Sequence, residues 1–407
     1  MIRTDDTTRP WLSIVGIGED GVAGLSERAR ALLAASDLVV GGDRHLALVG
    51  ALNKPSLPWR VPFSASLPEV LAQRGRNVVV LCSGDPFWHG AGAVLADHLA
   101  PQEWTALPAP STFSWAAAKL GWRLEDVVPL GLHARPIATL RPHLRDGAQL
   151  LVLLRDGAAV ADVAAYLTTS GFGASEIVVL EALGGPHERI RRTTASNYAY
   201  ADVAAPVALG IVAVAEPGAT IIPCTSGLPD DLFQHDGQLT KREVRAVTLS
   251  TLAPRGHELL WDIGAGSGSI GIEWLLAARS NRAIGIEARP DRLATARANA
   301  EALGVPHFDL RLGQAPDALA GLPSPDVVFI GGGASRPGVM ETVWQALPAG
   351  GRLVVNAVTL ETEALLIDWH GRHGGELLRL AVERASPVGG LTGWRAAMPV
   401  VQWSVRK

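Results

Sequence analysis

Short apolar runs alternate with longer Ala- and Leu-rich stretches along almost the whole chain, and two of these runs lead straight into glycine-rich turns. The first is WLSIVGIGEDG at residues 11–21, and the second is LLWDIGAGSGSIG at residues 259–271. Such runs are typical of buried strands, and the stretches between them have the length of helices, so the pattern predicts α/β domains with largely parallel sheets. We expect strands at 37–40, 78–82, 150–154, 177–180 and 207–214 in the first half, and at 259–263, 283–286, 326–330 and 352–356 in the second.

A polar connector divides the two series of strands. Residues 215–238 are rich in Pro, Gly and Asp and show no sustained hydrophobic period, which indicates a loop. A chain of 407 residues is long enough for two or three domains. We therefore expect a first domain over residues 10–215 and a second over residues 216–407.

The strongest chemical signal is the loop Asp262-Ile-Gly264-Ala-Gly266-Ser-Gly268, which follows an apolar run and precedes a helical stretch. Glycines at these positions let the backbone turn tightly and approach a ligand without a Cβ clash. The next predicted strand ends in Glu287, 21 residues after Gly266. A carboxylate there can accept hydrogen bonds from both hydroxyls of a ribose.

This pattern suits NAD or S-adenosylmethionine (SAM), and two details favour SAM. The third glycine follows the second after one residue, whereas the NAD fingerprint spaces it by two. Asp262 stands just before the first glycine, where it can reach the amino-acid end of SAM. The loop resembles that of the Rossmann-like class I SAM methyltransferases. The resemblance implies that Gln314 and Ala315, which follow a third strand, hold the adenine.

The first half carries a different set of glycine turns. Residues 16–21, GIGEDG, match the dinucleotide-binding pattern G-x-G-x-x-G, but Asp37 opens its strand instead of ending it, so the NAD interpretation lacks its acidic partner. The run at 78–82 leads into Ser-Gly-Asp-Pro, which resembles the G-D-P loop of the tetrapyrrole (class III) methylases, where backbone atoms receive SAM. This resemblance implies a SAM site formed by Gly16, Gly18, Gly84, Asp85, Pro86, Ser111 and Thr112.

Two further segments resemble one subfamily of these methylases. GLHAR at 131–135 stands where the subfamily has S-L-H-G-R, and EALGGPHERI at 181–190 resembles E-N-L-G-x-x-x-E-R-I. The resemblance gives His133 and Arg135 a catalytic or substrate-positioning role. The chain departs from the subfamily at Gly131, Ala134 and Ala182.

The two halves in this order, joined by the segment SGLPDDLFQHDGQLTKREVRAVTLSTL, resemble the precorrin-6Y C5,15-methyltransferase (decarboxylating) family. The resemblance implies a tetrapyrrole-methylase (class III) fold followed by a class I SAM methyltransferase fold, each with one SAM site. It implies C-5 methylation of precorrin-6Y by the first domain, and C-15 methylation with decarboxylation of the C-12 acetate by the second. The alternatives are a cobalt-containing precorrin as substrate, an RNA methyltransferase, or a non-catalytic nucleotide-binding module.

The substrate implied by this resemblance is a polycarboxylate, so each site needs local cations. On a helix, Lys241 and Arg245 would share one face and grip the substrate together. The glycine-rich segment 331–335 follows a predicted strand and could admit the flat ring. The other cationic candidates are Arg189, Arg191, Arg192 and Arg242.

Composition narrows the setting of this chemistry. A net charge of −4 provides no basic field for nucleic acid, and we find no metal-ligand cluster in the sequence. Two cysteines, Cys82 and Cys224, together with an N-terminus that lacks an apolar core, suit a cytoplasmic protein. The most apolar stretch, 203–214, is too short to cross a membrane. We expect a small-molecule tetrapyrrole substrate, no metal and a homo-oligomer.

Overall fold

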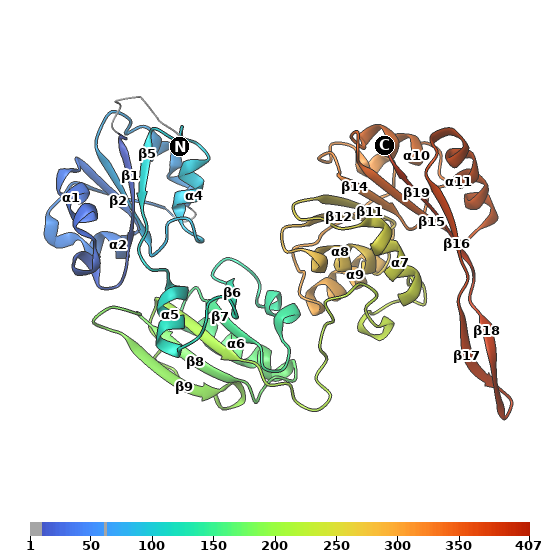
Figure 1. Ribbon diagram of the computed structural model, residues 1–407, viewed down its shortest axis with the longest axis horizontal. Coiled ribbons are helices and arrows are strands. Elements are labelled where there is room, and N and C mark those ends of the chain that lie inside the picture. Colours follow the sequence, from blue (N-terminus) through green and yellow to red (C-terminus); the bar gives the residue numbers. More distant parts are fainter. Residues whose placement is uncertain (1–9, 61–62) are drawn as a thin grey trace. The chain divides into compact units, whose positions relative to one another are not determined.

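The computed structural model describes residues 10–60 and 63–407, which form two compact units (Figure 1). The first unit runs to Ile137 and resumes from His143 to Thr220. The second comprises Ala138–Pro142 and Ile221–Lys407. Among the described residues, no helix combines the length and the hydropathy needed to cross a membrane.

The first unit begins with a five-stranded sheet, ordered β3-β2-β4-β1-β5, in which every pairing is parallel. Its strands are β1 (Leu12–Ile17), β2 (Leu38–Gly41), β3 (Ser56–Pro58), β4 (Val78–Ser83) and β5 (Trp104–Leu107). Helices α1 (Glu27–Ala35) and α2 (Asp43–Leu48) pack on one face, and α3 (Leu67–Leu71) and α4 (Ala91–Ala96) pack on the other. Cover on both faces explains why β1 is buried along its whole length and is apolar except for Ser13.

The second sheet of this unit, ordered β6-β7-β10-β8-β9, corrects the expectation of largely parallel sheets. Only β6 and β7 run parallel; β10 is antiparallel to both its neighbours, and β9 is antiparallel to β8. The strands are β6 (Val128–Gly131), β7 (Gln149–Leu153), β8 (Glu176–Glu181), β9 (Arg189–Thr194) and β10 (Val207–Val212), with helices α5 (Thr112–Leu120) and α6 (Ala158–Thr169). Alternation of strands and helices therefore predicted the class of the fold but not every strand direction.

The second unit contains a seven-stranded sheet ordered β13-β12-β11-β14-β15-β19-β16. The first five strands are parallel, and β19 runs antiparallel to both β15 and β16. This is the α/β architecture expected for a class I methyltransferase. Its strands are β11 (Leu259–Ile263), β12 (Arg282–Glu287), β13 (Asp309–Leu312), β14 (Val327–Ile330), β15 (Arg352–Ala357), β16 (Glu376–Leu380) and β19 (Val400–Arg406).

Helices cover both faces of this sheet (Figure 1). One face packs against α7 (Arg242–Leu252), α8 (Ser269–Ala277) and α9 (Pro290–Ala302), and the other against α10 (Val339–Ala346) and α11 (Leu360–His373). Trp274 anchors the first layer, while Trp369 and Trp403 anchor the second. The rigid two-layer cover fixes the carboxyl ends of the parallel strands, where the predicted SAM loop lies.

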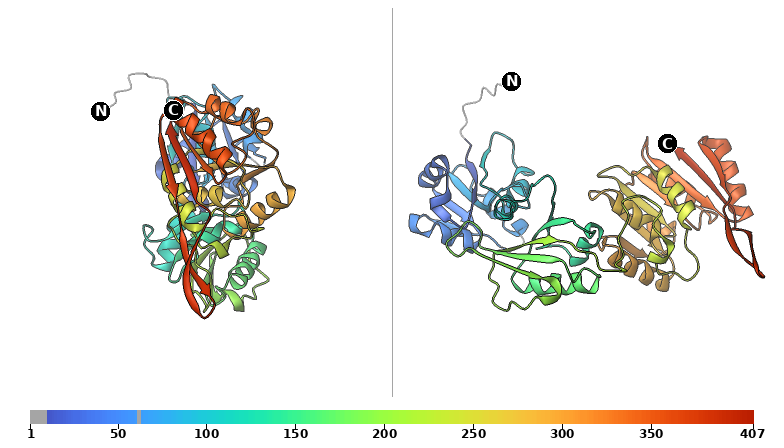
Figure 2. Two further views of the ribbon diagram at one scale, coloured as in Figure 1. Left: turned by 90° about the vertical axis from the view of Figure 1, so that its right-hand side faces the viewer. Right: turned by 60° about the horizontal axis from the view of Figure 1, so that its bottom comes forward.

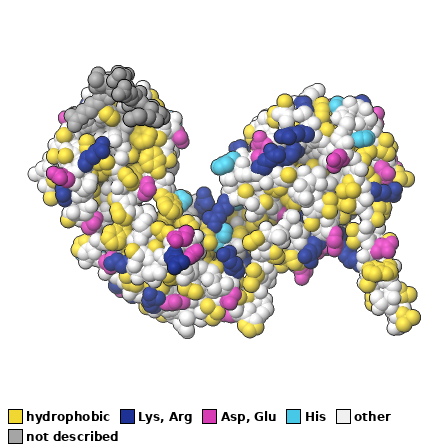
Figure 3. All heavy atoms as spheres, in the orientation of Figure 1, with side chains coloured by type: hydrophobic (Ala, Val, Ile, Leu, Met, Phe, Trp, Pro, Cys, Tyr) yellow, Lys and Arg dark blue, Asp and Glu magenta, His cyan; other side chains and the backbone are white. Residues whose placement is uncertain are grey.

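A two-stranded ribbon extends from this sheet between β16 and β19. It is formed by β17 (Glu383–Val388) and β18 (Leu391–Ala396), and it leaves the body of the second unit as a hairpin in every view (Figures 1 and 2). Hydrophobic side chains remain uncovered along it (Figure 3): Val388, Leu391 and Trp394 are 63%, 80% and 75% exposed.

Candidate functional site

Two adjoining hollows lie at the carboxyl ends of the parallel strands in the second unit. Their volumes are about 680 and 240 Å³, and both are lined by Gly264, Arg292 and Gly332. They straddle β11 and β14, where the chain order of the strands reverses. Ligands of open α/β sheets bind at such reversals, so the fold itself creates a crevice beside the predicted loop.

The glycines of that loop are required by the backbone. Gly264, Gly266 and Gly268 all have positive φ, at +72°, +58° and +79°. A Cβ on Gly264 would come within 3.0 Å of the backbone of Gly332, whereas a Cβ on Gly266 would meet nothing closer than 3.9 Å. The space beside Gly266 is therefore open toward the larger hollow, which that residue lines. The structure thus provides the close backbone approach that a bound cofactor needs.

Two acids, one in β11 and one at the end of β12, accept hydrogen bonds from backbone amides in and after the loop. Asp262 lines the larger hollow and accepts a hydrogen bond from the amide of Gly271 at 3.0 Å, and burial raises the pKa of its carboxyl group to about 7. Glu287 accepts hydrogen bonds from the amides of Gly266, at 2.8 Å, and Arg289, at 2.9 Å. Glu287 is only 6% exposed and is not among the described residues that line either hollow. Its contact with a ribose therefore remains a prediction.

The predicted adenine contacts lie beside the same loop. Gln314 and Ala315 line the smaller hollow together with Gly264. The fold therefore brings together residues that are 50 positions apart in the sequence, from Gly264 to Gln314. Gly268, in contrast, lines neither hollow; it caps α8, and a Cβ there would lie 3.1 Å from Ala296.

The prediction that Arg245 grips the substrate is wrong. Its side chain is fully buried, and its guanidinium bonds to Glu273 at 2.5 Å, to Asp230 at 3.0 Å and to two backbone carbonyls. Glu273 also accepts the amides of Gly227 and Leu228, so this cluster ties the connector to α7 and α8. Arg245 therefore has a structural role.

Lys241 differs from Arg245 because it lies outside the helix. It is the N-cap residue of α7, its side chain is 43% exposed, and its Nζ is 4.0 Å from the nearest carboxylate oxygen of Asp230. It lines the larger hollow. Two arginines that sequence reasoning missed also line it: Arg292, paired with Asp236 at 2.7 Å, and Arg384 at the base of the hairpin, paired with Glu243.

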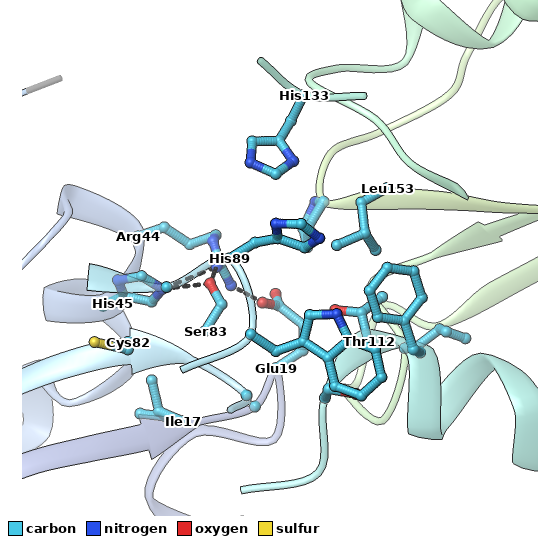
Figure 4. Close-up of a pocket in the computed structure, with 18 of the residues that line it drawn as sticks. Ile17, Glu19, Arg44, His45, Cys82, Ser83, His89, Thr112, His133 and Leu153 are labelled. Atoms are coloured by element: carbon cyan, nitrogen blue, oxygen red, sulfur yellow. Dashed lines mark hydrogen bonds and ion pairs between the residues drawn. The ribbon is translucent and has the colours of Figure 1, made fainter. Parts of the chain in front are cut away.

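The first unit contains a separate cavity of about 460 Å³ between its two sheets. Among the predicted residues, Gly18, Gly84, Ser111, Thr112 and His133 line it. They come from the loops after β1, β4 and β5 and from the segment after β6, so both sheets contribute. Figure 4 shows Thr112 and His133 from these two sources around the same space.

The remaining predicted residues of the G-D-P region build the loops and do not line the cavity. A Cβ on Gly16 would lie 1.9 Å from the carbonyl oxygen of Gly84 and 2.5 Å from the amide nitrogen of Ala109. Only glycine at this position of β1 therefore allows the loops after β4 and β5 to pack against the strand. Asp85 accepts the amide of Phe87 at 2.9 Å, which closes a turn, and the backbone of Pro86 lies against Gly90 and Gly92.

A polar cluster in this cavity was not predicted. Arg44 pairs with Glu19 and donates to Ser83 Oγ at 2.6 Å, and His45 Nε2 lies 2.8 Å from the same hydroxyl (Figure 4). Burial lowers the pKa of His45 to about 4, and the neighbouring Arg44 charge adds to that effect, so His45 is neutral near pH 7. The motif GGDRHL contains both Arg44 and His45, but no spacing rule links it to a loop 40 residues later.

The arginines of β9 are not free to bind a substrate. Arg189 and Arg191 both pair with the buried Glu181 and with Asp202, at 2.6–3.0 Å. Arg192 pairs with Glu176 at 2.7 Å. The arginines that the sequence suggested for binding the substrate carboxylates are therefore already paired with carboxylates of the protein. Arg135 is exposed and does not line the cavity; partial burial, and after it the charge of Arg135, lower the pKa of His133.

The described residues contain no group of three or more His, Cys, Asp or Glu side chains placed to hold a metal ion.

Comparison with known proteins accounts for both units. Residues 12–199 match the tetrapyrrole (corrin/porphyrin) methylases, and residues 231–407 match a precorrin methyltransferase domain. A precorrin-6Y C(5,15)-methyltransferase (decarboxylating) from a Sinorhizobium species is 52% identical over 399 residues, covering 98% of this chain and 97% of the relative. The chain belongs to this family. The relative of the same name from Mycobacterium tuberculosis (strain ATCC 25618 / H37Rv) is 40% identical over 398 residues, covering 97% of this chain and 99% of its own length.

A shorter relative matches only part of the chain. A probable cobalt-precorrin-6B C(15)-methyltransferase (decarboxylating) from Saccharolobus solfataricus is 38% identical over 142 residues, which are 33% of this chain and 71% of the relative. The full-length relatives confirm the family and the methyltransferase class predicted from the sequence. Methyltransferases of this family use SAM.

Proposed function

We propose that this chain methylates precorrin-6Y at C-5 and C-15 and removes carbon dioxide from its C-12 acetate. The observation that carries the proposal is a glycine-lined ligand cavity in each unit of a chain that aligns end to end with relatives of that name. Each unit holds one SAM molecule, which supplies an electrophilic methyl group.

In the second unit, the open space beside Gly266 fits the close approach of a nucleoside. Gly264 and Gly266 present backbone to the donor, Gln314 and Ala315 flank the adenine, and Glu287 accepts from the ribose while it keeps the loop in place. Asp262 faces the positively charged end of the donor. A positive charge there stabilises the carboxylate form of a group that burial otherwise leaves half protonated near pH 7.

The substrate lies on the other side of the larger hollow. Lys241 is the cation there with the loosest ion pair, so it can exchange Asp230 for a substrate carboxylate at little cost. Arg292 and Arg384 line the same wall. Positioning of ring and donor can lower the barrier by about 7–11 kcal/mol, and the conjugated ring itself accepts the electrons released with carbon dioxide.

In the first unit, Gly18, Gly84, Ser111 and Thr112 hold the donor, and His133 faces the same cavity. We assign C-5 methylation to this unit, and C-15 methylation and decarboxylation to the other, with the boundary near residues 215–216. The Saccharolobus relative supports this division, because its name joins C-15 methylation to decarboxylation in a protein that matches one third of the chain.

We further propose that the enzyme works in the cytoplasm as a homo-oligomer, in which the apolar hairpin packs against another copy. The exposed Val388 and Leu391, which pair across the hairpin, support this, because adjoining exposed apolar side chains mark interaction surfaces.

The direct test is to incubate the purified chain with SAM and precorrin-6Y and to follow product mass. We expect two methyl additions and the loss of one carbon dioxide. A product with one methyl group, or with its carboxylates intact, contradicts the proposal. A parallel incubation with a cobalt-containing precorrin tests the second candidate substrate, which the name of the Saccharolobus relative favours.

A further inference from the structure

Two histidines meet at the cavity of the first unit. His89 lies in the loop after β4 and His133 lies after β6, so the two sheets contribute one ring each. Their ring centroids are 5.7 Å apart and the rings are nearly perpendicular, at 75° (Figure 4). His89 also lies 6.4 Å from Phe113, in the first turn of α5, next to the predicted donor contact Thr112. His89 therefore lies beside both His133 and the first turn of α5, which carries the predicted donor contact.

Gly131 makes room for this pair. A Cβ at position 131 would lie 3.1 Å from Nε2 of His89, 3.1 Å from Cε1 of His133 and 3.3 Å from Nδ1 of His133. Such contacts are tighter than most Cβ contacts in proteins, so a side chain here would push both rings away by a few tenths of an ångström. Position 131 is also a departure from the S-L-H-G-R motif, where the related methylases carry a serine. The missing side chain lets two imidazoles converge on one point of the cavity.

The backbone of His89 is held in an uncommon conformation. Its φ is +60°, in the left-handed region that glycine and asparagine tolerate best. Strained residues of this kind cluster at active sites, where the fold fixes a side chain against its local preference. The loop thus holds His89 over the cavity.

Other ionisable groups that line the cavity are poorly suited to accept a proton. Glu19 is paired with Arg44, burial raises the pKa of Cys82 to about 12 so that it stays a thiol, and the remaining cation is Arg60. His45 is neutral, but its Nε2 already contacts Ser83 and Arg44.

The surroundings keep both members of the pair neutral. Partial burial, then the neighbouring His133, then Arg135 lower the pKa of His89, and partial burial with Arg135 lowers that of His133. A neutral imidazole can accept a proton near pH 7.

We propose that His89 is the proton acceptor for methylation in the first unit and that His133 positions it. This rests on the proposed C-5 methylation. A carbon–carbon bond forms between C-5 and the methyl group, and the carbon–sulfur bond of the donor breaks to leave a neutral thioether. The hydrogen on C-5 then leaves as a proton to Nε2 of His89, and the electrons of the carbon–hydrogen bond stay on the ring. The imidazolium returns the proton to water, so atoms and charge balance.

The test uses the full-length chain, precorrin-6Y and SAM carrying a carbon-13 methyl group, with the C-5 methyl signal followed by NMR. His89→Asn keeps a residue suited to positive φ but removes the base. We expect its C-5 methylation to slow at least about a hundredfold. The wild-type rate should rise with pH through a pKa below about 6.5 and then level off, and this step should be absent in His89→Asn. His98→Asn, an exposed histidine after α4, is the matched control and should behave as wild type.

Two further variants keep the assignment falsifiable. His89→Gly suits the same φ and leaves a hole, so added imidazole should restore C-5 methylation in it but not in His89→Asn. Gly131→Ala should slow the reaction by crowding both rings. A wild-type rate and pH profile in His89→Asn overturns the proposal, as does a pH step that only His133→Asn removes. If wild type gives no C-5 signal, or if Gly84→Val retains it, the proposed function of this unit fails instead.

Discussion

The two units are predicted to bind the same methyl donor, yet different kinds of residues line their cavities. The second unit places two buried acids beneath a loop of three glycines at positive φ. The first lines its cavity with backbone, neutral histidines and an arginine already paired with Glu19. The predicted site of the second unit thus depends on carboxylates at fixed strand ends, whereas that of the first depends on close contact between β1 and the loop after β4. Substitutions should therefore affect the two units in different ways.

The largest effect is expected at Gly16. Gly16→Val places side-chain atoms where the carbonyl of Gly84 lies, so the first unit should lose at least about 3 kcal/mol of stability and its C-5 methylation. The second unit should keep its thermal transition. Calorimetric unfolding checks this, with Gly50→Val as control, since a Cβ on Gly50 meets nothing within 4 Å. Unchanged unfolding of the first unit would show that β1 and the loop after β4 are not in contact at Gly16.

The buried cluster of the second unit should give the next effect. Arg245→Ala leaves Glu273 buried without its partner, so the second unit should lose about 3–5 kcal/mol of stability. Lys241→Ala should leave stability nearly unchanged and instead raise the KM for precorrin-6Y. Denaturant unfolding together with steady-state kinetics separates the two outcomes. If Arg245→Ala is stable and impaired only in KM, Arg245 does bind substrate.

A smaller effect is expected at Glu287. Glu287→Ala removes the acceptor for Gly266 and the predicted acceptor for the ribose, and SAM affinity of the second unit should fall at least about tenfold, or about 1.4 kcal/mol. Binding to the first unit should be spared. Titration calorimetry measures both sites in one experiment, and Asp368→Ala, in an exposed ion pair with Arg372 on α11, controls for general loss of charge. Equal affinity in Glu287→Ala would exclude the ribose contact.

The smallest effect concerns pH. The pKa of Asp262 is raised to about 7 in the free unit, and a bound cation favours the carboxylate and so lowers that pKa. SAM affinity of the second unit should therefore rise several-fold from pH 6 to pH 8, with proton release on binding. Calorimetry in buffers of different ionisation enthalpy measures this release. In Asp262→Asn, the increase in SAM affinity from pH 6 to pH 8 should be smaller by the part that Asp262 contributes. An identical increase in the variant would assign the pH dependence to another group.

The sequence predicted those features whose physical signal is local. Buried strands such as β11 and β15 consist of apolar runs, and the loop Gly264–Gly268 has a spacing set by backbone conformation. The edge strand β9 was missed, because it reads RIRRTT and its three arginines are balanced by Glu181, Asp202 and Glu176 on other segments.

Long-range placement was the other limit. No feature of the neighbouring sequence distinguishes Lys241 from Arg245. In the structure, Lys241 is the N-cap residue of α7 at the larger hollow, whereas Arg245 is buried and paired with Glu273. His89 and Arg384 reach their cavities only through the packing of distant loops and strands.

The central claim is that the chain carries two independent SAM sites, and the number of SAM molecules bound per chain tests it most directly. Titration calorimetry should find two in the wild type and one in Gly266→Val, whose side chain fills the open space beside the loop. Gly321→Val carries the same positive-φ strain outside both hollows of the second unit and should still bind two. A single SAM molecule bound per wild-type chain, or two bound to Gly266→Val, would contradict the account.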